Sequence, residues 1–199
     1  MTIVDLGIGN LASLKAAMSF LGVEFRISSD VEQITAARAI VLPGVGAFDA
    51  AARKLDAFGL RECLVERSAA GVPMLGICLG MQLLFAASEE GEADGLGIFD
   101  DKVVRLGRDA SSKVPHVGFD CVETETGTWL SDALGLNPYF YFTHSFAVVS
   151  SQADVVVGNC SYDGGFVAAL ERWPVVGAQF HPEKSQSAGL LFLASFIRR

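Results

Sequence analysis

The chain has 199 residues, of which 51% are hydrophobic and 19% charged, and its formal net charge is −8. This composition excludes intrinsic disorder, because the chain can bury a sizeable core, and the length suits a single domain spanning residues 1–199. A net negative charge without a cluster of Lys and Arg makes nucleic acid and anionic membranes poor candidates as partners.

The amino terminus and the cysteines indicate a cytoplasmic protein. No basic segment precedes the first apolar residues, so we expect a buried first strand and no signal peptide. The cysteines are widely spaced and fit neither a disulfide-rich domain nor a Cys-x-x-Cys zinc site. Two stretches lack charge, Ser68–Ser88 and Ala133–Ala153, but Gly, Pro, Asn and His interrupt both, which argues against a membrane span.

The first half of the chain repeats a strand and helix unit. Short apolar runs bounded by Gly or Pro indicate strands, and apolar residues three and four apart indicate helices. In chain order we expect strands at Thr2–Leu6, Val23–Ile27, Ala39–Leu42 and Val72–Ile77, and helices at Leu11–Leu21, Phe48–Arg67 and Leu79–Ala87. This alternation predicts a mainly parallel sheet with helices on both faces.

The second half changes to short apolar runs separated by turn residues. We expect strands at Val103–Val104, Val117–Val122, Tyr139–Phe142, Phe146–Val149, Val155–Val157, Phe166–Leu170 and Val175–Phe180, and a helix at Ser187–Ile197. Such a succession of strands predicts an antiparallel extension of the parallel sheet.

The strongest local signal is Gly76-Ile-Cys78-Leu-Gly80, which lies between an apolar strand and a predicted helix. This is the form of a nucleophile elbow, in which flanking glycines allow a tight turn. Cys78 at the start of a helix would be a reactive thiolate, and the N–H of Leu79 would face the same point. The motif is equally compatible with a small buried hydrophobe between closely packed glycines.

A second signal is Gln179-Phe-His181-Pro-Glu183-Lys-Ser185. Pro182 favours extended backbone at His181, and in extended chain residues i and i+2 project to the same side. His181 and Glu183 are therefore expected on one face, where a carboxylate can orient an imidazole that acts as a base. The alternative is a structural histidine. His116 and His144 have no acid at the same spacing.

The third signal, Pro43-Gly44-Val45-Gly46, follows a predicted strand. Its glycines allow either a simple turn or a backbone that points its N–H groups at a reacting carbonyl.

A rival motif is Gly7-Ile-Gly9-Asn-Leu-Ala12, which follows a strand and opens a helix as in dinucleotide-binding folds. Asp30 lies where a ribose-binding acid would be expected. The hypothesis of a dinucleotide-binding module does not explain the Cys78 elbow or the pair formed by His181 and Glu183.

Taken together, the three motifs around Gly44, Cys78 and His181 resemble those of the class I (triad) glutamine amidotransferases. More narrowly, the whole chain resembles the family of glutaminase subunits of imidazole glycerol phosphate synthases. The narrower resemblance is carried by the Gly7-x-Gly-Asn10 loop, Pro-Gly-Val45-Gly, Val114-Pro-His-Val-Gly118, Tyr141-Phe-Thr-His-Ser145 and Lys184-Ser185. This resemblance implies a flavodoxin-like fold and a reaction that requires no metal and no cofactor.

The resemblance also implies roles for individual residues. Cys78 would be the nucleophile that attacks L-glutamine, His181 the general base and acid, and Glu183 the residue that orients His181. The oxyanion would be held by the N–H of Leu79 and an N–H of the Gly44–Val45 peptide. The positions that match glutamine-binding residues of the family are Gly46, Gln82, Glu90 and Ser145.

The family further implies a heterodimer in which ammonia passes to a (β/α)8-barrel cyclase. That subunit makes imidazole glycerol phosphate and aminoimidazole carboxamide ribotide in histidine biosynthesis. The positions that the family places against it are Asn10, Pro115, His116, Phe119, Asp120 and Lys184. The chain departs from the usual pattern at Leu6, Phe119 and Asp120, which leaves open a paralogous glutaminase that serves another synthase, such as one in surface-sugar amidation. Two other classes of protein are alternatives. A Cys-dependent protease or chaperone of the same shape would give no reason for Gln82. A catalytically silent regulatory subunit would be expected to have lost a triad member.

Overall fold

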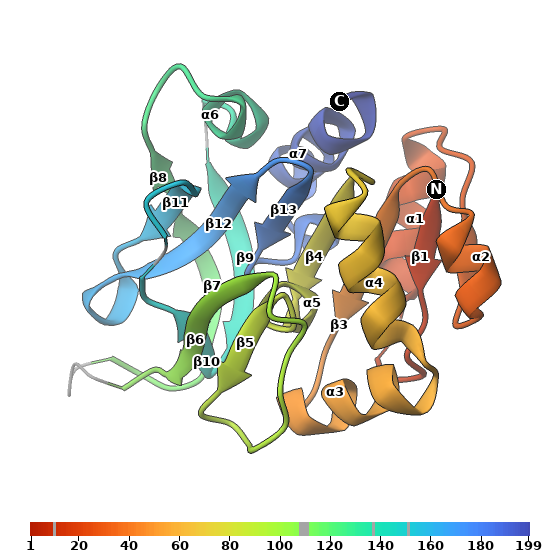
Figure 1. Cartoon of the computed structure of the whole chain (residues 1–199). Coiled ribbons are helices and arrows are strands. Elements are labelled where there is room, and N and C mark those ends of the chain that lie inside the picture. The colour runs from red at the N-terminus through yellow and green to blue at the C-terminus, as the bar shows by residue number, and fades with distance from the viewer. Residues whose placement is uncertain (10, 108–111, 137, 151) are drawn as a thin grey trace.

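The computed structural model describes residues 1–9, 11–107, 112–136, 138–150 and 152–199. Its centre is a mixed sheet whose parallel part has the strand order β2-β1-β3-β4-β13 (Figure 1). These strands are β1 (Thr2–Val4), β2 (Arg26–Ser28), β3 (Ile40–Gly44), β4 (Met74–Cys78) and β13 (Val175–Ala178). The order is that of flavodoxin-like sheets, and it confirms the predicted fold class.

The second half extends this sheet with mostly antiparallel strands, as predicted. β12 (Phe166–Arg172) runs antiparallel to β13, and β10 (Phe146–Val148), β6 (Phe99–Arg105) and β5 (Phe85–Ser88) follow outward. β11 (Val156–Cys160) pairs with β12 and with β8 (Glu123–Thr124). β7 (His116–Cys121) and β9 (Tyr139–His144) form a separate antiparallel pair.

Helices cover both faces of the sheet (Figure 1). On one side lie α1 (Ala12–Phe20), α6 (Trp129–Leu134) and α7 (Gln186–Arg198), and on the other α2 (Val31–Thr35), α3 (Phe48–Ala57) and α4 (Leu60–Ala69). Successive strand residues point to opposite faces, so Ile3 packs in the core beneath α1 and α7 while Val4 packs in the core beneath α3 and α4. The sheet is therefore buried on both sides, as its continuous apolar strands indicate.

Several local predictions were wrong in ways that long-range pairing explains. The helix expected at Leu79–Ala87 ends after one turn as α5 (Leu79–Gln82), because the chain from Phe85 onward pairs with β6 as strand β5. The helix expected at Phe48–Arg67 is broken at Gly59, which adopts a left-handed conformation between α3 and α4. The short helices α2 and α6 were not expected.

The two uncharged stretches fold as pieces of this α/β architecture. Ser68–Ser88 contains β4, α5 and β5, and Ala133–Ala153 contains β9 and β10. No helix within the described ranges is long and apolar enough to cross a membrane.

Two glycines allow the turn after β4 to pack directly on its neighbours. A Cβ atom on Gly80 would lie 1.7 Å from the carbonyl oxygen of Leu42 in β3, and one on Gly76 would lie 2.8 Å from the backbone of Gly80 and Met81. No side chain fits at either position without moving backbone atoms, those of β3 for Gly80 and those of α5 for Gly76. The turn is therefore held against β3 at van der Waals distance.

We expect Gly80→Ala to lower the free energy of unfolding by about 3 kcal/mol or more, because its new methyl group overlaps the backbone of β3. Gly71→Ala is the matched control, since Gly71 has a φ of +83° but open space around it. That substitution should cost only the strain of positive φ, about 1–2 kcal/mol. Urea unfolding measures both, and equal losses would contradict the close packing described for Gly80.

Candidate active site

The carboxyl ends of β3, β4 and β13 meet at one edge of the sheet. Gly44 is in register with Cys78, and Ala178 is in register with Ile77. The segments that follow these strands carry the three motifs singled out in the sequence. Ligands of open α/β sheets bind at this edge, where loops from neighbouring strands converge.

Cys78 occupies the turn between β4 and α5 in a strained conformation. Its φ of 53° and ψ of −112° lie outside the regions that residues with a side chain ordinarily adopt. A nucleophile elbow has this geometry, because the turn lifts the side chain off the end of the strand. Since α5 is only one turn long, fewer aligned peptide dipoles face the sulfur than the sequence led us to expect.

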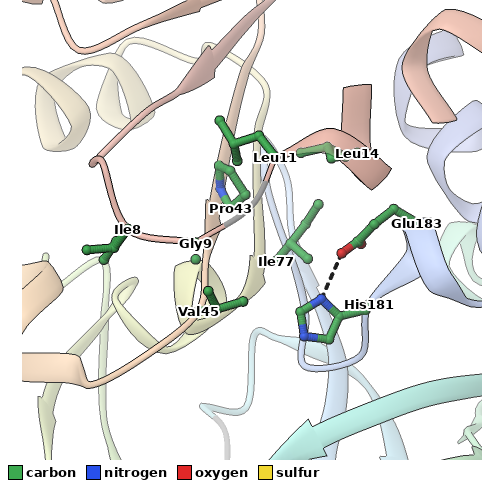
Figure 2. Close-up of a pocket in the computed structure, with 10 residues that line it drawn as sticks. Ile8, Gly9, Leu11, Leu14, Pro43, Val45, Ile77, His181 and Glu183 are labelled. Carbon is green, nitrogen blue, oxygen red and sulfur yellow. Dashed lines mark hydrogen bonds and ion pairs between the residues drawn. The ribbon is translucent and has the colours of Figure 1, made fainter. Parts of the chain in front are cut away.

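His181 and Glu183 lie on one side of the chain, as the extended backbone predicts. His181 has a φ of −96° and a ψ of 96°, and its Nδ1 lies 2.8 Å from Oε1 of Glu183 (Figure 2). The main-chain N–H of His181 donates to the carbonyl of Tyr141 at 2.9 Å, and the Ser185 hydroxyl donates to the carbonyl of His181 at 2.6 Å. The imidazole is thereby fixed in position by contacts on both sides.

The ring of His181 is 2% exposed and its charge state depends on its two neighbours. Burial alone lowers the pKa of an imidazole, but the Cys78 sulfur and the Glu183 carboxylate beside the ring outweigh it and raise the pKa of His181 to about 9. The Nε2 atom is buried and makes no hydrogen bond of ordinary geometry within the described residues. This nitrogen can therefore exchange a proton with a group in the adjoining cavity.

A cavity of about 340 Å³ opens beside Cys78 and contains most of the residues singled out in the sequence. It is lined by Val45, Gly46, Cys78, Leu79, Gln82, Glu90, Pro115, Thr143, His144, Ser145, Phe146 and His181. Of the catalytic, oxyanion and glutamine-binding residues that the resemblance singled out, the two that do not line this cavity are Gly44 and Glu183, which line a smaller void of about 20 Å³ that also borders His181 (Figure 2). The larger cavity has the size and the mixed polar lining of a small-molecule site.

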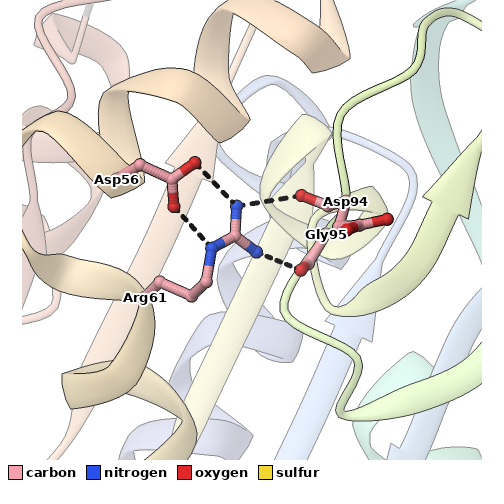
Figure 3. A network of polar contacts seen from close by, with 4 residues as sticks. All are labelled: Asp56, Arg61, Asp94 and Gly95. Atoms are coloured by element: carbon pink, nitrogen blue, oxygen red, sulfur yellow. Dashed lines mark hydrogen bonds and ion pairs between the residues drawn. The ribbon is translucent and has the colours of Figure 1, made fainter.

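Glu90 lies at this cavity on a loop that is attached to the neighbouring helices. Its Oε2 accepts the main-chain N–H of Phe48 at 2.7 Å, at the start of α3. Further along the loop, Asp49 accepts the N–H of Ala93 at 3.0 Å. Arg61 pairs with Asp56 and donates to the carbonyls of Asp94, at 3.0 Å, and Gly95 (Figure 3). Such partly exposed ion pairs add little stability, but they fix the position of the loop and so of Glu90.

Sequence reasoning missed several polar contacts behind the cavity. Gln82 Nε2 donates to the carbonyl of Phe146 at 2.8 Å and to Oε1 of Gln179 at 3.0 Å. Gln179 Nε2 lies 3.7 Å from the sulfur of Cys78. His144 Nδ1 lies 2.9 Å from the same carbonyl of Phe146. No local spacing in the sequence points to the contacts of Gln82 and Gln179, because each joins segments that are far apart in the chain.

His116 has no acid two residues on, as the sequence shows, but it contacts one at a different spacing. His116 Nε2 lies 3.5 Å from Oδ2 of Asp120, four residues on, and its Nδ1 lies 3.3 Å from Nε2 of His144 on the facing strand. Burial lowers the pKa of His116, against the effect of Asp120, and lowers the pKa of His144 to about 3. Both rings are neutral at neutral pH.

The other positions that the resemblance singled out differ in exposure. Phe119 is 50% exposed, Lys184 and Pro115 are exposed, and Asp120 is partly exposed, whereas His116 is 4% exposed and offers almost no side-chain surface. Asn10 lies outside the described residues. Asp30, the acid of the rival motif, accepts the N–H of Gln33 at 2.9 Å and caps α2. Its role in the structure is that of a helix cap.

The chain matches one protein family over almost its full length. The family described as "Glutamine amidotransferase class-I" matches residues 2–197. Among curated relatives, "Imidazole glycerol phosphate synthase subunit HisH" of Salinibacter ruber is 41% identical and covers 98% of this chain and 92% of that protein. The protein of the same name from Pyrococcus furiosus is 42% identical, with 98% and 97% covered.

Solved structures share the fold at lower identity. A structure described as "Crystal structure of glutamine amidotransferase" covers 99% of this chain and 97% of that chain, with a TM-score of 0.76 and 19% identity. "Structure of PurLQS from Thermotoga maritima" has a TM-score of 0.72 and 17% identity, with 99% and 96% covered.

Glu183→Gln removes a carboxylate that raises the pKa of His181, so we expect the variant's ring to lose its proton below the parent value of about 9. A raised pKa stabilises the folded state fully below the unfolded value of about 6.5, and this stability is lost as the pH rises through about 9. The parent should therefore lose more stability than the variant between about pH 7 and pH 10.

Nitrogen NMR of the His181 ring and urea unfolding at each pH measure the two effects. Asp120→Asn is the matched control, since it removes a carboxylate beside a different histidine, His116. An unchanged titration midpoint in Glu183→Gln would show that Glu183 has no influence on the charge of His181.

Proposed function

Because this chain belongs to the class-I glutamine amidotransferases, we propose that it is the glutamine-hydrolysing subunit of an imidazole glycerol phosphate synthase, acting in histidine biosynthesis. The observation that carries the proposal is the arrangement of three side chains. Cys78 and His181 line one cavity, and Glu183 contacts the far nitrogen of His181 at 2.8 Å. A thiol, an imidazole and a carboxylate in this order form a nucleophile, a base and an orienting acid.

In this proposal the Cys78 thiolate attacks the side-chain amide carbon of glutamine. His181, protonated on Nε2, gives its proton to the leaving nitrogen, so that ammonia departs and a γ-glutamyl thioester remains. His181 then takes a proton from water, which attacks the thioester and releases glutamate and the Cys78 thiolate. Glu183 stabilises the imidazolium, which a pKa of about 9 keeps charged at neutral pH.

We assign the oxyanion hole to two backbone segments that face Cys78. The N–H of Leu79 stands at the start of α5, where helix N–H groups have no partner within the helix. The Gly44–Val45 peptide follows β3 directly opposite Cys78. Gly46, with a φ of 101°, gives this loop a conformation that side chains rarely permit, so the peptide can reorient at low cost.

The cavity offers both charged and neutral groups that can bind glutamine. The carboxylate of Glu90 suits the α-ammonium group of glutamine, and Ser145 and Gln82 offer neutral hydrogen-bonding groups within the same cavity. Gly46 also lines the cavity and has open space where a side chain would begin. We propose these four residues as the glutamine-binding set.

We propose that ammonia passes to a (β/α)8-barrel cyclase bound as a heterodimer. The exposed face of the β7 and β9 pair supports a docking surface, because Val117, Phe119 and Tyr139 are all exposed there. Phe119 packs edge-on against Tyr141, and Lys184 lies over the Tyr141 ring. Aromatic residues and an adjacent cation are typical of protein interfaces.

The proposal also covers the cellular compartment and the domain organisation of the protein. We propose a cytoplasmic enzyme whose residues 1–199 form a single domain. A paralogous glutaminase serving a different synthase is the alternative that Leu6, Phe119 and Asp120 favour, since they depart from the usual pattern of the family.

Cys78→Ala should abolish glutamine-dependent synthesis by the assembled complex and leave synthesis from an added ammonium salt nearly intact, because cyclisation takes place in the other chain. Product formation from each nitrogen source, at equal complex concentrations, measures the difference. Glutamine hydrolysis that persisted in Cys78→Ala would refute the assignment of the nucleophile. Loss of both activities would point to a structural role for Cys78.

We expect the isolated chain to be a weak glutaminase that the ligand-bound barrel subunit activates by a factor of about 10²–10³, the usual value of one oxyanion donor. The Gly44–Val45 peptide would supply that donor when the partner docks. Titration with the barrel at low and high salt, with Asp120→Asn alongside, also tests whether Asp120 faces a cation of the partner. Full turnover by the isolated chain would rule out such a switch, and identical salt dependence would remove Asp120 from the interface.

A further inference from the structure

Two buried amides connect the strand β10 backbone to the sulfur of Cys78. The carbonyl of Phe146 accepts a hydrogen bond from Gln82 Nε2 at 2.8 Å, and the same nitrogen donates to Oε1 of Gln179 at 3.0 Å. Gln179 Nε2 in turn lies 3.7 Å from Sγ of Cys78. Gln179 is fully buried and is not one of the residues that line the cavity. Its side chain therefore reaches the nucleophile from behind.

The carbonyl oxygen of Phe146 determines the orientation of both side-chain amides. A main-chain carbonyl can only accept, so Gln82 must present its NH2 group to Phe146. Gln82 then has its second N–H for Gln179, which must present its oxygen to Gln82. Rotating either amide by half a turn would set two donors or two acceptors against each other. The Phe146 carbonyl thus ensures that an N–H group faces the sulfur of Cys78.

We propose that Gln179 is a further catalytic residue, whose side-chain N–H donates to the Cys78 thiolate and stabilises it. The proposal rests on the proposed function of Cys78 as the nucleophile. A hydrogen bond to an ionised group is about twice as strong as one between neutral groups, and burial strengthens it further because water does not compete.

Gln179 differs from His181 in that it keeps its proton throughout the reaction. His181 gives up a proton when ammonia leaves and regains one from water, so its charge changes during each turnover. The Gln179 amide presents the same N–H in every step. It therefore stabilises Cys78 both as the attacking thiolate and as the thiolate that leaves when the thioester is hydrolysed.

The experiment compares Gln179→Met, which keeps the length of the side chain but has no donor, with Gln179→Glu, which places an acceptor beside the sulfur. The rate of Cys78 alkylation by iodoacetamide is followed against pH in the full chain, with mass spectrometry of the Cys78 peptide separating it from the other cysteines. Thr2→Val is the control, because Thr2 is a buried polar residue at the opposite end of the sheet.

We expect Gln179→Met to move the pH profile of Cys78 alkylation upward by about one unit, which slows the reaction about tenfold on the rising limb, and Gln179→Glu to move it further. The kcat for glutamine should fall while KM changes little, because Gln179 does not line the cavity. Thr2→Val should match the parent. Unchanged alkylation profiles in both Gln179 variants would overturn the proposal.

A measurement on the parent chain covers the case in which the variants do not fold. The side-chain amide resonance of Gln179 should shift as Cys78 ionises, and this shift should disappear in Cys78→Ala. An amide signal that does not respond to pH would overturn the proposal as well. The alkylation profile and the amide resonance use neither glutamine nor a partner, so failure of the proposed function, seen as hydrolysis that persists in Cys78→Ala, remains distinguishable from failure of the role given to Gln179.

Discussion

The close approach of the Cys78 turn to strand β3 is the constraint on which the rest of the site depends. Gly80 lies so near the carbonyl of Leu42 that no Cβ atom fits between them, and Cys78 is in register with Gly44 across the same two strands. The sulfur and the Gly44–Val45 peptide are therefore placed relative to each other by the hydrogen-bond ladder of a buried parallel sheet. The unusual φ of Cys78 persists because the surrounding backbone leaves no alternative.

Burial determines which of the polar groups near this edge of the sheet interact strongly. His181 is almost completely buried, and the Glu183 side chain is 10% exposed, so their interaction at 2.8 Å is little screened by water. The Arg61 contacts with Asp56 and the loop near Gly95 are partly exposed and act mainly by holding a segment in position. The energetics of the site are concentrated in a few enclosed contacts, while its shape depends on more numerous surface ones.

The sequence predicted those features that local chemistry determines. Glycines two residues on either side of Cys78 indicate the elbow, and Pro182 forces the extended backbone that brings His181 and Glu183 to one side. Features created by pairing between distant segments were missed. Nothing within the run from Leu79 to Ala87 shows that Phe85 will pair with β6, and nothing beside Gln179 shows that it will meet Gln82. The rival motif failed because Asp30 starts a short helix, a role that its type and position permit equally well.

The buried pair of imidazoles on β7 and β9 has too few protons for its contacts. His144 must carry its proton on Nδ1 to donate to the Phe146 carbonyl, which leaves its Nε2 as an acceptor toward His116. A neutral His116 has one N–H to share between His144 at 3.3 Å and the Asp120 carboxylate at 3.5 Å. With Asp120 ionised, one of these two contacts always places two hydrogen-bond acceptors against each other with no proton between them. The two strands are accordingly joined at this end by their backbone ladder and by stacking of His116 of β7 on Phe142 of β9, and the ring nitrogens contribute a frustrated contact instead of a bond.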